Sequence, residues 1–228
     1  MLRARKKISK KDLKHDPMLE AIFKIETFFK SYSKEALYGV IGIIALIVVG
    51  IIFLNSKSKA EVDAAAAVGI AQFKFMSGDF QDAIVRLEDA LRKYPGTKAA
   101  TQGTFYLGSA NYQAGNKDDA ERNFRDYLDE SQDDRLLAAS AYAGIAAVRE
   151  DKQDYAEAAE NYKKAVLKTE SQFQIEMYTI SAVRNYHKAG NNDIALNLIE
   201  DMLSDENISF EAKNSLEFLK SVISNAKG

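Results

Sequence analysis

Residue types that perform covalent chemistry are scarce in this chain. Its 228 residues contain no cysteine and only two histidines, His15 and His187, which excludes a paired-histidine zinc motif. Neither a Gly-Lys-Ser/Thr phosphate loop nor a Gly-x-Ser-x-Gly nucleophile elbow occurs. Carboxylates are plentiful, but pairs such as Asp118 and Asp119 fall where helices are expected to start, and capping is their usual role there. We therefore expect no enzyme, no metal site and no cofactor.

The charged residues are divided unevenly along the chain. Residues 1–36 hold ten Lys/Arg against five Asp/Glu, residues 55–228 hold twenty-one against twenty-eight, and residues 37–54 hold none. The basic tail includes Arg3, Arg5, Lys6, Lys7, Lys10 and Lys11. Because basic residues cluster only in this tail, nucleic-acid binding is disfavoured, and contact with anionic lipid headgroups is the favoured role of the cluster.

The eighteen residues from Leu37 to Leu54 predict a transmembrane helix. At about 1.5 Å per residue they span roughly 27 Å, close to the ~30 Å hydrocarbon core of a bilayer. The alternatives are a buried helix, which is seldom apolar on every face, and a signal peptide, whose apolar run is usually shorter. The excess of Lys and Arg before the span predicts a cytoplasmic N-terminus, with the residues after the span in the periplasm of a bacterium.

Ahead of the span, apolar residues at helical spacing predict an amphipathic helix over about residues 17–30, with Phe23, Phe28 and Phe29 in its apolar stripe. Two interpretations are open. The helix lies on the cytoplasmic leaflet or against a membrane partner, or it simply continues into the span. After the span, residues 55–60 are expected to form a short linker.

An internal repeat fills residues 61–205. Aligned stretches place Gly78, Gly115, Gln153 and Gly190 in one slot, with spacings of 37, 38 and 37. Each unit predicts two antiparallel helices, because Gly suits the left-handed residue that ends a helix and Asp or Asn opens the next. Residues 206–228 predict a last helix and a tail, and this helix would close the exposed end of the stack.

These units resemble the tetratricopeptide repeat. The second unit carries the family's pattern as Leu107-Gly108, Tyr112, Gly115, Ala120 and Phe124. The resemblance implies three slots per unit that need small side chains, and nine of the twelve are filled by Ala71, Ala83, Ala90, Gly108, Ala120, Ala146, Ala158, Ala165 and Ala195. The predicted fold is all-α, with one N-terminal transmembrane helix, then a right-handed solenoid of about four degenerate helical hairpins and a C-terminal capping helix.

The resemblance also implies a protein-binding groove lined by the first helix of each unit. The family's groove positions correspond to Val68, Gln72, Phe75, Met76, Phe105, Ser109, Tyr112, Gln113, Met177, Ile180, Arg184 and His187. Such a trough suits an extended segment or a helix of another protein. The alternative is that several of these residues are core between neighbouring units.

The whole layout, with local similarity around Phe28 to Leu37, resembles the ancillary subunit family of the bacterial Sec translocon. This implies a single-pass inner-membrane scaffold or chaperone-like protein, whose periplasmic repeats bind translocon subunits, secreted clients or periplasmic chaperones. One alternative is a structural organiser of the cell envelope or division machinery with a fixed partner. Another is an import receptor with cytosolic repeats, which the flanking charges disfavour. The sequence leaves the oligomeric state open.

Overall fold

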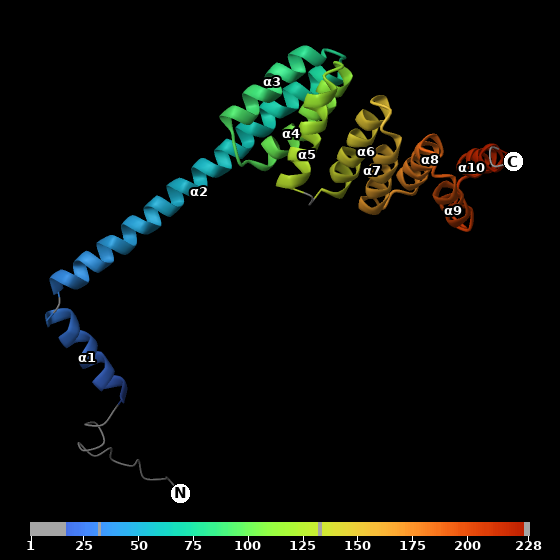
Figure 1. The fold of residues 1–228 in the computed structure, drawn as a ribbon. Coiled ribbons are helices and arrows are strands. Elements are labelled where there is room, and N and C mark those ends of the chain that lie inside the picture. The colour runs from blue at the N-terminus through green and yellow to red at the C-terminus, as the bar shows by residue number, and fades with distance from the viewer. Residues whose placement is uncertain (1–16, 32, 132–133, 226–228) are drawn as a thin grey trace, which may run out of the picture. The chain divides into compact units, whose positions relative to one another are not determined.

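The computed structural model describes residues 17–31, 33–131 and 134–225, which form ten α-helices and no strand (Figure 1). The all-α prediction is therefore confirmed. The chain divides into two compact units, Met1–Lys57 and Ser58–Gly228. We call the second unit the repeat domain. The basic residues assigned to lipid contact between Arg3 and Lys11 lie outside the described residues.

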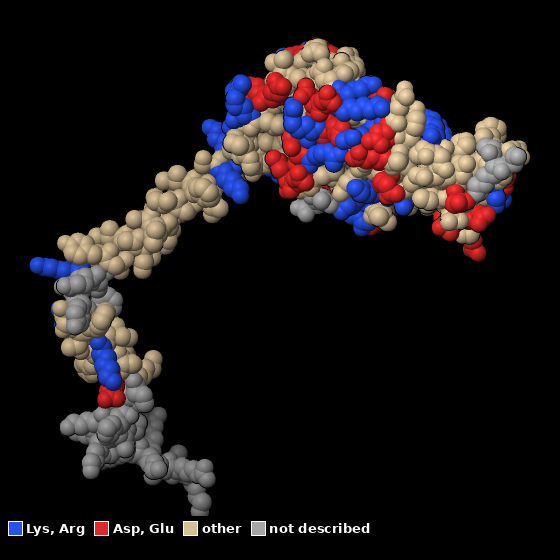
Figure 2. Space-filling model, in the orientation of Figure 1, with Lys and Arg blue, Asp and Glu red and all other residues tan. Residues whose placement is uncertain are grey.

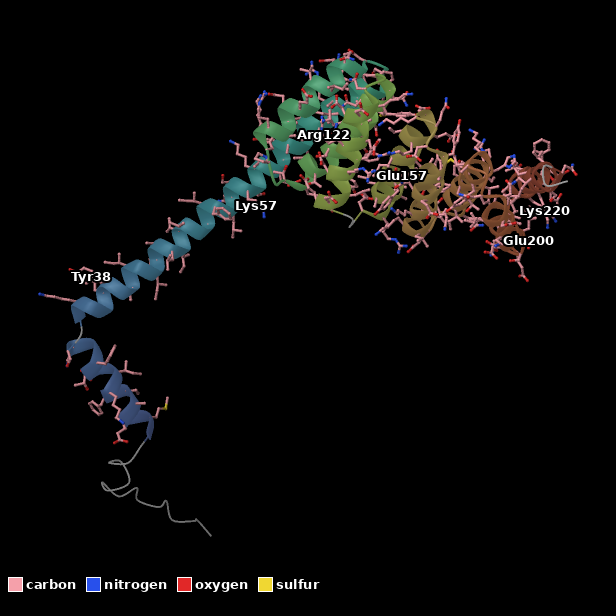
Figure 3. All side chains as sticks on the ribbon, in the orientation of Figure 1. Tyr38, Lys57, Arg122, Glu157, Glu200 and Lys220 are labelled. Atoms are coloured by element: carbon pink, nitrogen blue, oxygen red, sulfur yellow. The ribbon has the colours of Figure 1, made fainter. Side chains whose placement is uncertain are left out.

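Two helices account for the described part of the N-terminal segment. Helix α1 spans Pro17–Ser31, in agreement with the predicted amphipathic helix, and α2 spans Ser33–Met76. Within the described residues, α2 is the one helix that is long and apolar enough to cross a membrane, judged by length and composition alone. Its stretch 37–54 carries no Lys, Arg, Asp or Glu (Figure 2). In Figure 3, the label Tyr38 lies near the start of this stretch and the label Lys57 lies just after its end.

The expected linker at residues 55–60 is helical instead, because α2 passes through it without interruption. Its sequence, Asn-Ser-Lys-Ser-Lys-Ala, is polar but contains neither Gly nor Pro, so nothing in it breaks a helix. The helix then buries Ala64, Val68 and Ala71 at helical spacing. The last four turns of α2 therefore serve as the first helix of the first repeat unit.

The repeat domain is a series of antiparallel helical hairpins (Figure 1). After α2, the helices are α3 (Phe80–Lys93), α4 (Lys98–Gln113), α5 (Lys117–Glu130), α6 (Arg135–Asp151), α7 (Tyr155–Lys168), α8 (Gln172–Lys188), α9 (Asn192–Leu203) and α10 (Phe210–Asn225). Helices that follow one another from α3 to α9 pack together, and α10 packs on α8 and α9.

The turn inside each hairpin has the predicted backbone. Gly78, Gly115 and Gly190 adopt φ values of 80°, 85° and 79°, and Gln153 in the same slot adopts 63°. An L-residue in this left-handed conformation costs about 1–2 kcal/mol relative to the right-handed one, so the Gln153 turn is strained where the others are not. The helix that follows the strained turn is capped by Asp154, whose side chain accepts a hydrogen bond from the Glu157 N–H.

All nine predicted small-residue slots are buried, which supports the repeat frame. The three larger residues that depart from the rule, Tyr127, Val183 and Met202, are buried as well. The closest packing surrounds Phe124 of α5. A Cβ built on Gly108 of α4 would lie 2.8 Å from its ring, and one built on Gly144 of α6 would lie 2.5 Å from it. The ring therefore fits only because both neighbouring helices present a glycine there.

Candidate protein-binding groove

The first helices of successive units begin at a constant interval. Helix α4 starts at Lys98, α6 at Arg135, α8 at Gln172 and α10 at Phe210, which are steps of 37, 37 and 38 residues. Helix α10 therefore occupies the place of the first helix of a fifth unit. It packs on α8 and α9 and buries Leu216 completely, so it does cover the end of the stack, but it also provides a second wall beside α8.

A groove of about 620 Å³ runs between α8 and α10. It is lined by Gln172, Phe173, Glu176, Met177, Ile180, Arg184, Asn207, Ser209, Glu211, Ala212 and Ser215. Phe173 is 72% exposed and Met177 is 41% exposed, so the apolar part of the lining is open to solvent. The charged residues of the lining are one basic, Arg184, and two acidic, Glu176 and Glu211. The lining therefore combines exposed apolar surface with a few polar groups that can form hydrogen bonds.

Hydrogen bonds that Glu176 accepts hold the two walls together. The carboxylate of this buried residue accepts from the Ser209 N–H at 2.8 Å and from the Ser209 hydroxyl at 2.7 Å. Burial by itself raises the pKa of Glu176, but the hydrogen bonds from Ser209 and Gln172 outweigh it and leave the pKa below its usual value. Glu176 is therefore ionised at neutral pH and fixes the start of α10 against α8.

Three of the predicted groove residues line this groove. Met177, Ile180 and Arg184 lie on its α8 wall, with Ile180 half-buried against the core and Arg184 exposed. The predicted His187 is not part of the lining, and its Nδ1 lies 2.8 Å from Asn192 Oδ1.

The predicted residues of α4 belong mainly to the packing between helices. The ring of Phe105 lies 5.7 Å from that of Phe124 and 5.8 Å from that of Tyr127, so it is part of the core between α4, α5 and α6. Tyr112 is half-buried against the same core, and burial, followed by the Asp151 carboxylate, raises its pKa. The hydroxyl of Ser109 donates to the Phe105 carbonyl, while Gln113 is exposed at the end of α4.

The predicted residues of α2 do not form one site either. Val68 is 3% exposed in the core between α2, α3 and α4, which contradicts its groove assignment. Phe75 packs against Phe80 with ring centroids 5.7 Å apart, and Gln72 is half-buried. Only Met76 is open, at 83% exposure. Of the residues assigned to lipid contact, Phe23 and Phe28 on α1 are exposed, and the side chain of Phe29 lies outside the described residues.

The sequence prediction missed the α10 wall and the exposed Phe173 in the groove lining. Leu136 and Phe173 are the second residues of α6 and α8, and Phe210 is the first residue of α10. The three residues are 37 positions apart and are 57%, 72% and 74% exposed. The constant spacing was the available signal, because a residue at a repeat-equivalent position shares its direction with the others.

These features define a class of protein, a stack of helical hairpins with an open groove. In the part of the chain that the structure describes, no three His, Asp or Glu residues are placed to hold a metal ion. A family model described as a tetratricopeptide repeat-like domain matches residues 26–206. The chain therefore belongs to the tetratricopeptide repeat-like domain family. Domains of this type typically act as non-catalytic scaffolds that bind other proteins. No curated protein matches the chain.

Proposed function

We propose that this protein is a membrane-anchored scaffold that holds segments of other proteins in the groove between α8 and α10. The observation that carries the proposal is the open apolar lining formed by Phe173, Met177 and Ile180. Monomeric proteins rarely leave large apolar side chains exposed together in a concave surface unless a partner or ligand binds there. An apolar or amphipathic segment is the occupant that such a lining selects.

The anchor in this proposal is the stretch 37–54 of α2, with the N-terminus in the bacterial cytoplasm and the repeat domain in the periplasm. Its support is the uncharged length of the stretch and the excess of Lys and Arg ahead of it. In this setting the protein assists secreted or membrane proteins beside the Sec translocon, as the resemblance of its layout implies. Periplasmic chaperones and translocon subunits are the partners expected there.

The topology is tested by fusing alkaline phosphatase after Gly228 in a bacterial host. We expect an active fusion, because the enzyme forms its disulfides only in an oxidising compartment. Phosphatase fused ahead of Met1 of the full chain, on the other side of the span, is the matched control and should be inactive. An inactive but membrane-inserted Gly228 fusion, together with an active N-terminal fusion, would reverse the orientation.

Binding in the groove is tested with the double variant Phe173→Ala and Met177→Ala. We expect it to bind a fluorescent, unfolded secretory protein at least about tenfold more weakly than the parent chain, since exposed apolar anchors carry most binding energy. Leu167→Ala, which removes a 77% exposed leucine of α7, is the control and should bind normally. Binding is measured by fluorescence anisotropy, with the full chain in mild detergent. Unchanged affinity of the double variant would exclude the groove.

Crosslinking from Met177 distinguishes a translocon helper from a structural organiser of the cell envelope. A photocrosslinking residue at Met177 should capture many different secretory chains in living cells if the protein is a translocon helper. A structural organiser would instead capture one folded partner, and that result would replace the translocon proposal.

A further inference from the structure

The final part of α2 has two apolar faces. One face buries Ala64, Val68 and Ala71 in the core that α2 shares with α3 and α4. The opposite face exposes Val62 and Phe73, each at 67%. An amphipathic helix at the edge of a solenoid normally turns a polar face to solvent. The second apolar face therefore requires an explanation.

The exposed face follows the spacing of a coiled-coil seam. Its members are Val62, Ala66, Gly69, Phe73 and Met76, with intervals of four, three, four and three residues. All five are exposed, and a Cβ built on Gly69 would meet no atom within 4 Å. The small residues at the centre of the seam allow a second helix to approach the backbone closely. We call these five residues the α2 seam.

The α2 seam faces the position that a preceding hairpin would occupy in a solenoid, because each repeat packs on its two neighbours. Here the chain that precedes the seam is α2 itself, back to Ser33. The described residues ahead of α2 form one helix, α1, and no hairpin. The exposed seam therefore has room for a helix of another molecule, and its spacing suits one.

We propose that the occupant is the α2 helix of a second copy of this chain, aligned parallel and in register. The parallel direction rests on the proposed single-span anchor, which inserts every copy the same way. In this alignment the residues bordering the seam, Asp63 and Ile70 on one side, meet Ala65 and Gln72 of the other copy. Only one of these four is charged, so self-pairing brings no like charges together.

Apart from Asp63, the charged groups in this part of α2 are engaged with other helices of the same chain. Glu61 accepts hydrogen bonds from the N–H groups of Lys98 and Ala99, both at 2.8 Å, at the start of α4. Lys74 pairs with Asp82 of α3 at 2.9 Å. Neither needs to be desolvated when the seam is covered, which removes a common cost of burying a helix face.

Ile70 of α2, which borders the seam, and Val85 of α3 are 54% and 63% exposed. They line one edge of a groove of about 480 Å³ between α2 and α3, whose other lining residues are Ala67 and the charged Asp82, Arg86, Glu88, Asp89 and Arg92. The proposed contact covers Ile70 and leaves the charged part of this groove open to solvent. The contact is isologous, with the same patch used by both copies, so it closes at a dimer.

Disulfide trapping tests the pairing directly, because the natural chain contains no cysteine. Single variants Ala66→Cys and Gly69→Cys of the full chain are oxidised in permeabilised native membranes, so that the reagent reaches both sides of the bilayer. We expect covalent dimers at both positions, at least about fivefold more than at the controls, since a disulfide needs Cα atoms within about 7 Å. The controls are Asp63→Cys, next to the seam, and Leu167→Cys, an exposed site on α7.

Equal dimer yields at all four positions would indicate random collision, and no dimer at Ala66 or Gly69 would show that the seam is not paired with itself. Either result overturns the proposal. A disulfide between Gly69→Cys chains and Phe218→Cys chains, without Gly69 homodimers, would instead identify head-to-tail contact with α10 and also overturn it. Groove binding and phosphatase topology are measured independently, so a failed crosslink leaves the proposed function standing, and a failed groove test leaves the dimer standing.

Discussion

Replacing Phe124 by alanine should lower the free energy of unfolding by about 3–5 kcal/mol. The ring is 3% exposed and is enclosed by Gly108 of α4 and Gly144 of α6. It also contacts the Phe105 ring at 5.7 Å. Its removal would open a cavity where α4, α5 and α6 meet. The helices cannot move together to fill this cavity, because other buried residues of the same core hold them in place.

Urea unfolding of the full chain in mild detergent measures this loss. Tyrosine fluorescence can follow it, because the chain has no Trp and nine of its eleven Tyr lie in the repeat domain. The complementary variant Gly144→Ala should cost about 1–3 kcal/mol by overpacking the ring. Combining it with Phe124→Leu should cost less than the sum of the two single changes, since the smaller side chain leaves room for the methyl group. Strict additivity would show that the ring and the glycine are not in contact.

An exposed phenylalanine provides the control for this series. Phe218 on α10 is 68% exposed, and Phe218→Ala should change stability by no more than about 0.5 kcal/mol. A loss comparable to that of Phe124→Ala would mean that aromatic content in general, rather than the enclosure between two glycines, determines stability here.

The repeat frame could be predicted from the sequence because it depends on local rules. The small slots and the left-handed turn residues recur at a fixed interval, and both reflect close packing or backbone conformation at one position. Gln153 shows that residue type alone does not predict every turn. The hairpin requires a positive φ at this position, and Gln153 adopts one as the glycines do, although its side chain makes that conformation unfavourable.

The groove could be predicted only in part, because it depends on two walls. The direction of Phe105 is decided by the Phe124 and Tyr127 rings, which come from another helix, and helical periodicity alone does not distinguish core from groove at such a border position. The second wall at α10 follows an irregular turn, and its role is set by the hydrogen bonds between Ser209 and Glu176. The prediction of a linker at residues 55–60 was wrong for a simpler reason. The segment is polar, but a polar composition alone does not end a helix.

The second large effect concerns Glu121 of α5, whose side chain is 9% exposed and lies among three cations. Its carboxylate accepts from Arg125 at 2.8 Å, from Lys152 at 3.2 Å and from Arg149 of α6. Arg149 continues the network to Glu157 of α7 at 3.0 Å, a residue labelled in Figure 3. This network ties the second unit to the third, and loss of the buried Glu121 charge would take the shared partner away from all three cations.

The pKa of Glu121 makes this contribution dependent on pH. Burial alone raises the pKa, but the hydrogen bonds from the three cations outweigh it and lower the pKa from 4.5 to about 2. Because the folded state holds the proton less tightly than the unfolded state, the stabilisation is complete above the unfolded pKa. It is lost as the pH falls from about 4.5 toward 2. At about 1.4 kcal/mol for each unit of pKa, the amount lost is roughly 3 kcal/mol.

The variant Glu121→Gln keeps the shape of the side chain and removes its charge. We expect it to be less stable than the parent chain by roughly 3 kcal/mol above pH 5.5, with the difference shrinking toward zero as the pH approaches 2. Glu200→Gln is the matched control, because Glu200 pairs with Lys220 at 3.1 Å but is 61% exposed (Figure 3). Exposed pairs contribute about 0–1 kcal/mol, so that variant should match the parent at every pH. A stability difference for Glu121→Gln that stayed constant down to pH 3 would mean that the charge of Glu121 is not what holds the two units together.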